Sequence, residues 1–126
     1  RGNYKAKWLA AGGYGAIAER LFGGVDVDAY FLEYDTPRAG DFGPLKYLSP
    51  NKVAVLGLIS SKSPEMETMD QLRRRVEEAS RTVPLERLAI SPQCGFATSV
   101  GSKPMSPDDQ LRKLELIVNA ARQIWK

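Results

Sequence analysis

The feature that most constrains the fold is a nearly continuous apolar run, V-A-V-L-G-L-I-S, at residues 53 to 60. A strand of this kind is buried on both faces, as in parallel sheets that helices cover. Residues 27 to 33 and 87 to 91 contain shorter apolar runs, which also predict strands. Because parallel strands need long crossover connections, we expect helices between these three runs.

Helical segments are predicted around the strands. Apolar residues recur at helical spacing in residues 14 to 22 and 69 to 83, and a shorter helix is expected near residues 44 to 48. Thr68 and Gln71 fit a capping box, in which each side chain satisfies a backbone group of the other residue. The helix predicted at residues 69 to 83 therefore has a defined start.

A last helix is predicted from Ser106 and Pro107, because serine caps helices well and proline suits their first turn. Its apolar residues follow a helical stripe. The stripe consists of Leu111, Leu114, Val118, Ala121 and Trp125.

The alternation of helices and strands predicts an α/β fold with about three parallel strands and right-handed crossovers. Three strands covered by helices on one side leave the other face of the sheet bare, and the first helix has no strand before it. We therefore expect residues 1 to 126 to form a single domain, the C-terminal part of a (β/α)8 TIM barrel whose first five strands lie upstream of Arg1. A small independent α/β sandwich is the alternative.

Composition excludes several classes of function. The net charge is only +3, and the basic residues are not interleaved with aromatic ones, so we expect no nucleic-acid partner. No apolar stretch approaches the roughly 18 residues that cross a membrane. The single cysteine rules out an internal disulfide and suits a reducing, cytoplasmic compartment. The chain has no histidine, which excludes catalysis or metal binding by histidine from these residues alone.

Polar side chains follow each predicted strand: Glu33, then the Ser60-Ser61-Lys62 segment, then Cys94. In parallel α/β folds, functional groups gather at these carboxyl ends. Alternation along the first strand places Glu33 on the same face as Phe31, toward a barrel interior. Carboxylate and thiolate are both zinc ligands, so a zinc site is one interpretation. A packed Cys94 and a salt-bridged Glu33 are the other.

Two segments resemble a known family. F-L-E-Y-D at residues 31 to 35 and S-P-Q-C-G-F at 91 to 96 look like the C-terminal catalytic barrel of cobalamin-independent methionine synthase, and especially its short homologues that lack the N-terminal domain. The opening R-G-N-Y is similar to the residues that follow a His-x-Cys pair there. The resemblance implies a zinc ion held by Glu33, Cys94 and a His-x-Cys pair upstream of Arg1, so this chain looks like a C-terminal fragment.

The chemistry that the resemblance implies is methyl transfer to the thiol of homocysteine, with 5-methyltetrahydrofolate or a methyl-corrinoid as donor. Ser60 stands where the synthases carry a histidine that protonates the leaving folate, and it is the candidate catalytic residue. Asp35, Arg38 and Lys62 are candidate substrate-binding residues on the loops of the same face.

Two alternatives to this function stay open. One is zinc-dependent alkylation of another thiol, as in the epoxyalkane:coenzyme M transferases. The other is an inert fragment, or half of a split barrel that pairs with its N-terminal part or with itself. An isolated part-barrel exposes sheet edges and an apolar face, so such pairing is expected.

Overall fold

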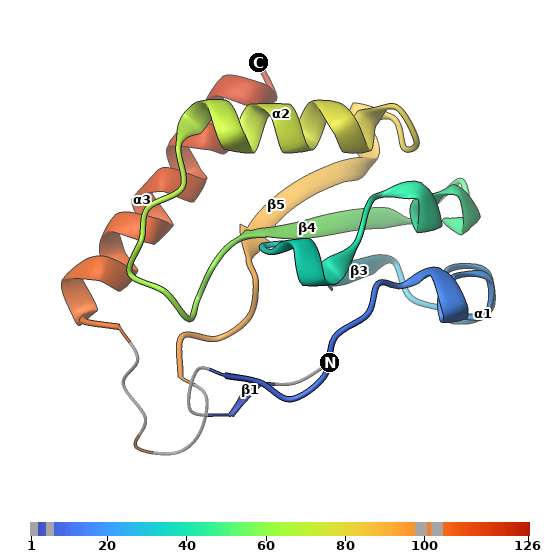
Figure 1. Ribbon diagram of the computed structural model, residues 1–126. Helices are drawn as coiled ribbons and strands as arrows, with labels where there is room; N and C mark the ends of the chain where they lie inside the picture. Colours follow the sequence, from blue (N-terminus) through green and yellow to red (C-terminus); the bar gives the residue numbers. More distant parts are fainter. Residues whose placement is uncertain (1–2, 5–6, 98–100, 102–104) are drawn as a thin grey trace.

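The computed structural model describes the chain except residues 1–2, 5–6, 98–100 and 102–104 (Figure 1). Parts of the R-G-N-Y opening and of the loop after Cys94 therefore lie outside the described residues. The elements, with η for 3-10 helices, are in chain order β1 (Asn3–Tyr4), β2 (Lys7–Trp8), η1 (Gly15–Ile17), α1 (Ala18–Gly24), β3 (Ala29–Glu33), η2 (Pro37–Ala39), η3 (Gly43–Tyr47), β4 (Val53–Ile59), α2 (Met69–Ser80), η4 (Leu85–Arg87), β5 (Leu88–Pro92) and α3 (Pro107–Ile124).

The three predicted strands form one parallel sheet in the order β3-β4-β5. The apolar run at 53 to 60 becomes the central strand β4, as its continuous burial requires. The predicted α/β class with three parallel strands is confirmed. A two-residue antiparallel pair, β1 with β2, precedes them and was not predicted, because two-residue strands carry no periodic signal.

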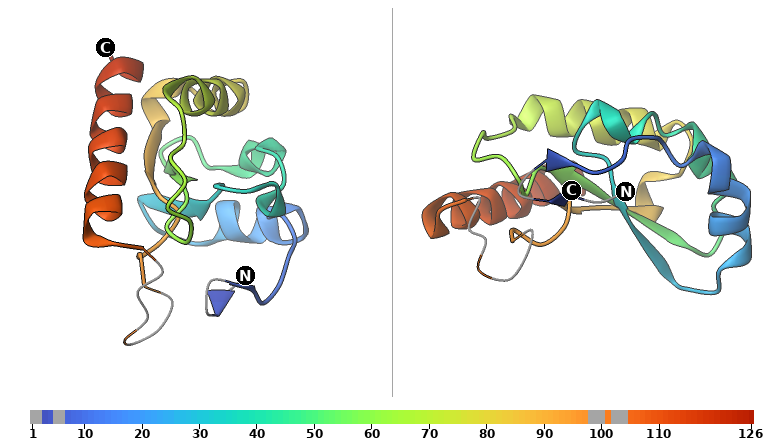
Figure 2. Two further views of the ribbon diagram at one scale, coloured as in Figure 1. Left: turned by 60° about the vertical axis from the view of Figure 1, so that its left-hand side comes forward. Right: turned by 60° about the horizontal axis from the view of Figure 1, so that its bottom comes forward.

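The two faces of the sheet differ in cover. Tyr30 and Leu32 of β3 are buried on the helix side, whereas Phe31 on the opposite side is 76% exposed. In Figure 1, α2 runs above the sheet and α3 lies beside β5, and the views in Figure 2 agree. This opposite face is open at the edge strand β3, whereas Val55 of the central strand, which pairs with Phe31, is only 8% exposed. Glu33 lies on the same face as Phe31 by alternation.

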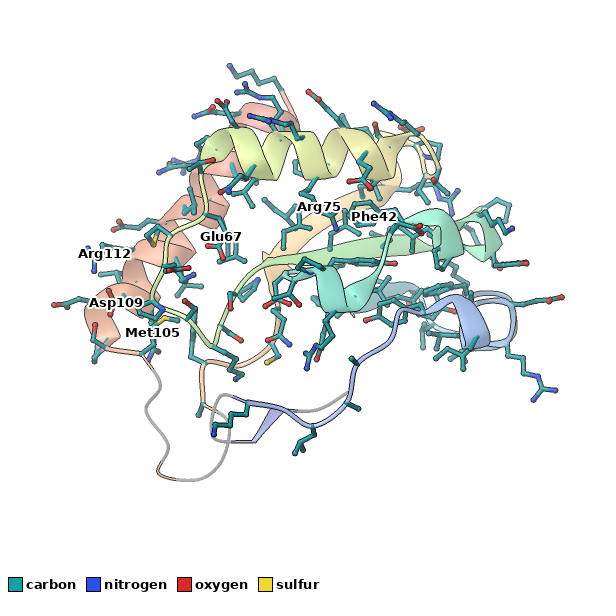
Figure 3. All side chains as sticks on the ribbon, in the orientation of Figure 1. Phe42, Glu67, Arg75, Met105, Asp109 and Arg112 are labelled. Carbon is teal, nitrogen blue, oxygen red and sulfur yellow. The ribbon has the colours of Figure 1, made fainter. Side chains whose placement is uncertain are left out.

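Aromatic side chains join α1 to the sheet and to the loop after β3. The ring of Phe22 meets that of Tyr30 edge-on at 5.3 Å between centroids, and Tyr34 packs against Phe42 at 4.5 Å. Arg75 of α2 lies over the Phe42 ring, 4.2 Å from its centroid (Figure 3). Such pairs add stabilisation beyond the apolar area that they bury. They hold the segment after β3 beneath α2.

The helix starts follow the predictions. Thr68 accepts a hydrogen bond from the Gln71 backbone N–H group at 3.2 Å, and the Gln71 side chain accepts from the Thr68 N–H group at 2.7 Å. Ser106 accepts from the Asp109 N–H group at 3.1 Å. α1 covers the second half of the helical segment predicted at residues 14 to 22 and ends at Gly24.

The face of α3 that packs inward differs from the predicted apolar stripe. Leu111, Leu114 and Val118 are exposed, at 58%, 44% and 47%. The fully buried residues of the helix are Lys113 and Ala120. The apolar stripe is present in the sequence of α3, but a different face of the helix packs against β5 and α2. An apolar face with helical period indicates burial only when a partner lies against it.

Candidate functional site

The carboxyl ends of the three strands meet at one edge of the sheet. Glu33 pairs in register with Gly57, and Gly57 pairs with Ser91. Glu33 and the segment that leads to Cys94 thus lie on the two sides of β4 at the same level. Neighbouring strands are about 4.8 Å apart, so the backbones of β3 and β5 are separated here by roughly 10 Å.

Gly57 brings the strand ends into close contact. A Cβ atom at this position would lie 2.8 Å from the Leu32 carbonyl oxygen and 2.9 Å from the Gln93 Cα atom. Any side chain would therefore push β3 and β5 away from β4. The pairing of β4 with β5 also shifts register between Gly57 and Ile59. This irregularity turns the chain after Pro92 across the end of β4.

Glu33 lies beside a buried arginine. Its Oε2 atom is 3.3 Å from the Arg38 Nη2 atom, and the Arg38 side chain is 2% exposed. The Glu33 backbone N–H group donates to the Tyr14 hydroxyl at 2.8 Å. Arg38 was expected on a loop of the active face. Its side chain is buried against Glu33, and its role in substrate binding stays a prediction.

Cys94 is exposed, but its sulfur contacts two buried side chains. The Sγ atom lies 3.3 Å from the Ser61 Oγ atom and donates to the Gln93 Oε1 atom at 2.9 Å. Ser61 is 0% and Gln93 5% exposed. Gln93 was not singled out from the sequence, where its only signal is its place next to the cysteine.

A polar network surrounds Ser60 at the end of β4. The Ser60 N–H group donates to Glu67 Oε1 at 2.7 Å, and Lys113 Nζ is 3.0 Å from Glu67 Oε2. Lys113 also donates to the Glu65 carbonyl oxygen at 2.5 Å. The Ser60 side chain hydrogen-bonds to Asp35, but burial outweighs that bond and raises the pKa of the Asp35 carboxyl. Figure 3 labels Glu67 between α2 and α3.

Glu67 and Lys113 are site-supporting residues that the sequence analysis missed. A signal for Lys113 exists, because it precedes Leu116 by three residues and Ala120 by seven and so shares their face of the helix. The predicted substrate-binding residue Lys62 donates to the Gly95 and Ala97 carbonyl oxygens, at 2.5 and 3.0 Å. Lys62 thus joins the end of β4 to the loop that follows Cys94.

A cavity of about 500 Å³ lies between the segment after β3 and α2. Its volume is within the usual range for small-molecule pockets. Both walls come from this chain. Asp35, Thr36, Leu58, Gln71, Leu72 and Arg74 are among the lining residues.

Glu33 and Cys94 are residue types that bind zinc, but two ligands are too few for a complete zinc site. Glu33 offers a carboxylate and Cys94 a thiol, both common zinc ligands. Within the part of the chain that the structure describes, no three metal-ligating side chains gather in one place. Zinc sites use three or four protein ligands. The described residues therefore supply at most part of a zinc site.

Comparison with known proteins identifies the family. The catalytic domain of cobalamin-independent synthase matches residues 19–123. The chain belongs to this family. An uncharacterised Bacillus subtilis protein, YxjG, is 46% identical over 127 residues, which cover 100% of this chain and 34% of YxjG. The 5-methyltetrahydropteroyltriglutamate–homocysteine methyltransferase of Saccharophagus degradans is 30% identical over 104 residues, or 79% of this chain and 12% of that protein.

Solved structures agree with this family. A Listeria monocytogenes protein assigned to the vitamin-B12 independent methionine synthases has a TM-score of 0.69 at 40% identity, covering 91% of this chain and 33% of that one. A B12-independent methionine synthase from Shewanella sp. W3-18-1 has a TM-score of 0.72 at 19% identity, covering 88% and 30%. The three-stranded sheet and its helices thus match part of a methionine synthase barrel, which confirms the predicted fold.

The chain spans about a third of the length of the Bacillus relatives that it matches. It is related to cobalamin-independent methionine synthase, a family of methyltransferases in methionine biosynthesis. Among the described residues, no helix combines the length and apolar character needed to cross a membrane.

Proposed function

We propose that the protein to which this chain contributes transfers a methyl group to a thiol with the help of zinc, and converts homocysteine to methionine. One observation carries the proposal: Glu33 and the P-x-C-G segment of Cys94 stand at the carboxyl edge of the sheet in a chain of the methionine synthase family. That edge is where barrel enzymes hold their active sites. The residues on either side of β4 are those that the family resemblance assigns to zinc.

In this proposal Glu33 and Cys94 hold the metal together with ligands from outside this chain. When bound, zinc would favour the thiolate form of the acceptor, which is the reactive nucleophile. Arg38 keeps the Glu33 carboxylate in place through its contact with Oε2. Ligand orientation of this kind typically changes metal affinity by about 10- to 100-fold. A reducing cytoplasm would keep Cys94 available as a ligand.

The methyl donor is proposed to be 5-methyltetrahydrofolate or a methyl-corrinoid. Ser60, at the place of the synthase histidine, is hydrogen-bonded to Asp35 and fixed through its backbone by Glu67. A serine hydroxyl holds its proton near neutral pH, so Ser60 orients the donor by hydrogen bonding in this proposal. Lys62 and Asp35 remain the proposed substrate-binding residues, and Arg38 acts on the substrate only through Glu33.

The partner that we propose for this chain is the rest of a barrel. Phe31 is exposed on the open face of the sheet, and Leu111, Leu114 and Val118 are exposed on α3. Burial of a Leu or Val side chain contributes about 1.5–3 kcal/mol. Upstream strands and helices would cover these surfaces. A second copy of this chain is the alternative partner for these surfaces. The fragment alone is expected to be inactive.

The proposal is tested in the protein with its barrel complete. Cys94→Ser and Glu33→Gln should each lower the zinc content measured by elemental analysis and abolish methyl transfer to homocysteine. Glu86→Gln, an exposed carboxylate before β5, is the matched control and should retain both. Full zinc content in Cys94→Ser contradicts the ligand assignment. Zinc binding with transfer to coenzyme M in place of homocysteine would favour the second candidate, alkylation of another thiol.

A further inference from the structure

The sulfur of Cys94 contacts two side chains that the family resemblance does not assign. Ser61 comes from the end of β4 and Gln93 from the end of β5, and both are almost entirely buried. The three groups contact one another: Ser61 Oγ donates to Gln93 Oε1 at 2.9 Å, and Cys94 Sγ is within hydrogen-bond distance of both. Two separate strands therefore meet at this sulfur.

The hydrogen bonds of this cluster are unevenly distributed. The Gln93 Oε1 atom accepts from both the serine hydroxyl and the thiol, whereas the buried Gln93 Nε2 atom has no partner among the described residues. Burying an amide N–H group without a partner costs about 1–3 kcal/mol. The sulfur also lies 3.4 Å from the Gly95 carbonyl oxygen, which can only accept. The cluster thus holds a donor that a protonated Cys94 does not use.

A half-turn of the Gln93 amide would offer the Cys94 sulfur a hydrogen-bond donor in place of an acceptor, which is what a metal-bound sulfur requires. The two ends of the amide are nearly isosteric, so Nε2 takes the place of Oε1 without movement of the backbone. From there, its two N–H groups reach both Cys94 Sγ and Ser61 Oγ at the observed 2.9 Å. The serine hydroxyl is then released to donate to the sulfur at 3.3 Å. A metal-bound cysteine is a thiolate, which accepts such bonds.

We propose that Ser61 and Gln93 are positioning residues for Cys94, and that they donate hydrogen bonds to its sulfur when that sulfur binds a metal ion. The inference rests on the proposed function, since it gives Cys94 the role of ligand. It adds that the end of β4 contributes to the site through Ser61 rather than through Ser60 alone. Because partners of this kind orient metal ligands, their loss should weaken metal binding about 10- to 100-fold.

The first experiment needs no metal. This chain has one cysteine, so its Raman spectrum should contain one S–H stretching band. Gln93→Met removes the nearer acceptor of that S–H group, leaves the more distant Gly95 carbonyl oxygen, and should move the band to higher frequency. Ser91→Ala is the matched control, because its hydroxyl donates to the Pro92 carbonyl oxygen and not to the sulfur. An unchanged band in Gln93→Met overturns the contacts on which the inference stands.

The second experiment uses cobalt(II) as the probe in the protein with its barrel complete. Ser61→Ala removes a single buried oxygen atom, and Gln93→Met replaces the amide by an apolar chain of similar length. Both should lower cobalt affinity about 10- to 100-fold and shift the thiolate-to-cobalt absorption band, whereas Ser91→Ala should change neither. Wild-type affinity with an unshifted band in both variants overturns the inference. A wild-type protein that binds neither cobalt nor zinc overturns the proposed function instead, and the Raman result then decides the contacts alone.

Discussion

The two long helices of this chain use their side chains in opposite ways. α2 buries Leu72, Val76 and Ala79, which lie on its apolar face. α3 buries Lys113 and Ala120 and exposes Leu114 and Val118. Both helices have capped starts and sequences that read as amphipathic. They differ in what lies against them.

The difference teaches that the apolar face of α2 is buried within this chain, while most of the apolar stripe of α3 stays exposed. α2 lies over the sheet and finds its partner in the chain's own strands. α3 turns a charged residue inward because Lys113 meets Glu67 and the Glu65 carbonyl oxygen there. That ion pair holds the segment between β4 and α2, and through Glu67 it holds the backbone of Ser60. With the Lys113 face of α3 turned inward, Leu111, Leu114 and Val118 remain exposed.

The largest expected effect is on the buried lysine. Lys113→Ala should lower the free energy of unfolding by about 3–5 kcal/mol, because it leaves the Glu67 carboxylate without its cation in a site that is 19% exposed. Arg112→Ala, next to it on α3, removes an exposed ion pair with Asp109 and should cost less than about 1 kcal/mol. Urea unfolding monitored by circular dichroism measures both. Equal losses of unfolding free energy in the two variants would mean that the buried Lys113–Glu67 pair adds no more stability than the exposed Arg112–Asp109 pair.

Two leucines test the comparison of the helix faces directly. Leu72→Ala in α2 should lower the free energy of unfolding by about 2–5 kcal/mol, because it opens a cavity under the helix. Leu114→Ala in α3 should change it by no more than about 0.5 kcal/mol, since that side chain is 44% exposed. The same urea titrations apply. A loss of more than 2 kcal/mol at Leu114 would show that α3 buries its stripe within this chain.

The helix caps should behave alike. Thr68→Ala and Ser106→Ala each remove a side-chain oxygen that accepts from a backbone N–H group, and each should cost about 1 kcal/mol. Replacement of either residue by glycine should cost only a few tenths of a kcal/mol, and this variant serves as the control for loss of the side chain. Thermal unfolding followed at the helix band resolves this difference. A much smaller loss at Ser106 would indicate that the start of α3 is already frayed.

The smallest effects should have opposite signs at two aspartates. Burial beneath α2 raises the pKa of Asp35, so the charged carboxylate destabilises the fold above that pKa. Asp35→Asn should raise the melting temperature near neutral pH, and the gain should fade as the pH drops toward the ordinary pKa of about 3.9. At the start of α3, hydrogen bonds from Ser106 and Arg112 lower the pKa of Asp109.

Asp109 therefore contributes stability that is present above its unfolded pKa and is lost as the pH falls through the folded one. Asp109→Asn should lower the melting temperature near neutral pH, and the loss should vanish in acid. Melting curves across this pH range measure both variants. A shift of the same sign for the two aspartates would contradict the different environments of Asp35 after β3 and Asp109 at the start of α3.

Much of the fold was predictable because its signals are local. The apolar run of β4, the Thr68–Gln71 box and the Ser106–Pro107 start each lie within a few residues, and all three are observed. The position of Glu33 and Cys94 at strand ends followed from the same signals. The exposure of Phe31 and the burial of Tyr30 agreed with alternation along β3.

What remained hidden depends on contacts between distant segments. Arg38 lies buried against Glu33 because the η2 turn, which begins four residues after Glu33, brings its side chain back to that carboxylate. Gln93 and Ser61 meet at Cys94 because Gly57 lets β5 cross close to the end of β4. Contacts of this kind cannot be predicted from the sequence, because each residue is typical of its own segment.

The sequence by itself determined which segments become strands and helices, through apolar period and cap chemistry. Only the tertiary structure decided which face of α3 turns inward and which side chains surround the candidate ligands. The physical reason is that period and capping act over one or two turns of chain. Burial, in contrast, is decided by whatever packs against a face, and for Lys113 that is a carboxylate 46 residues away.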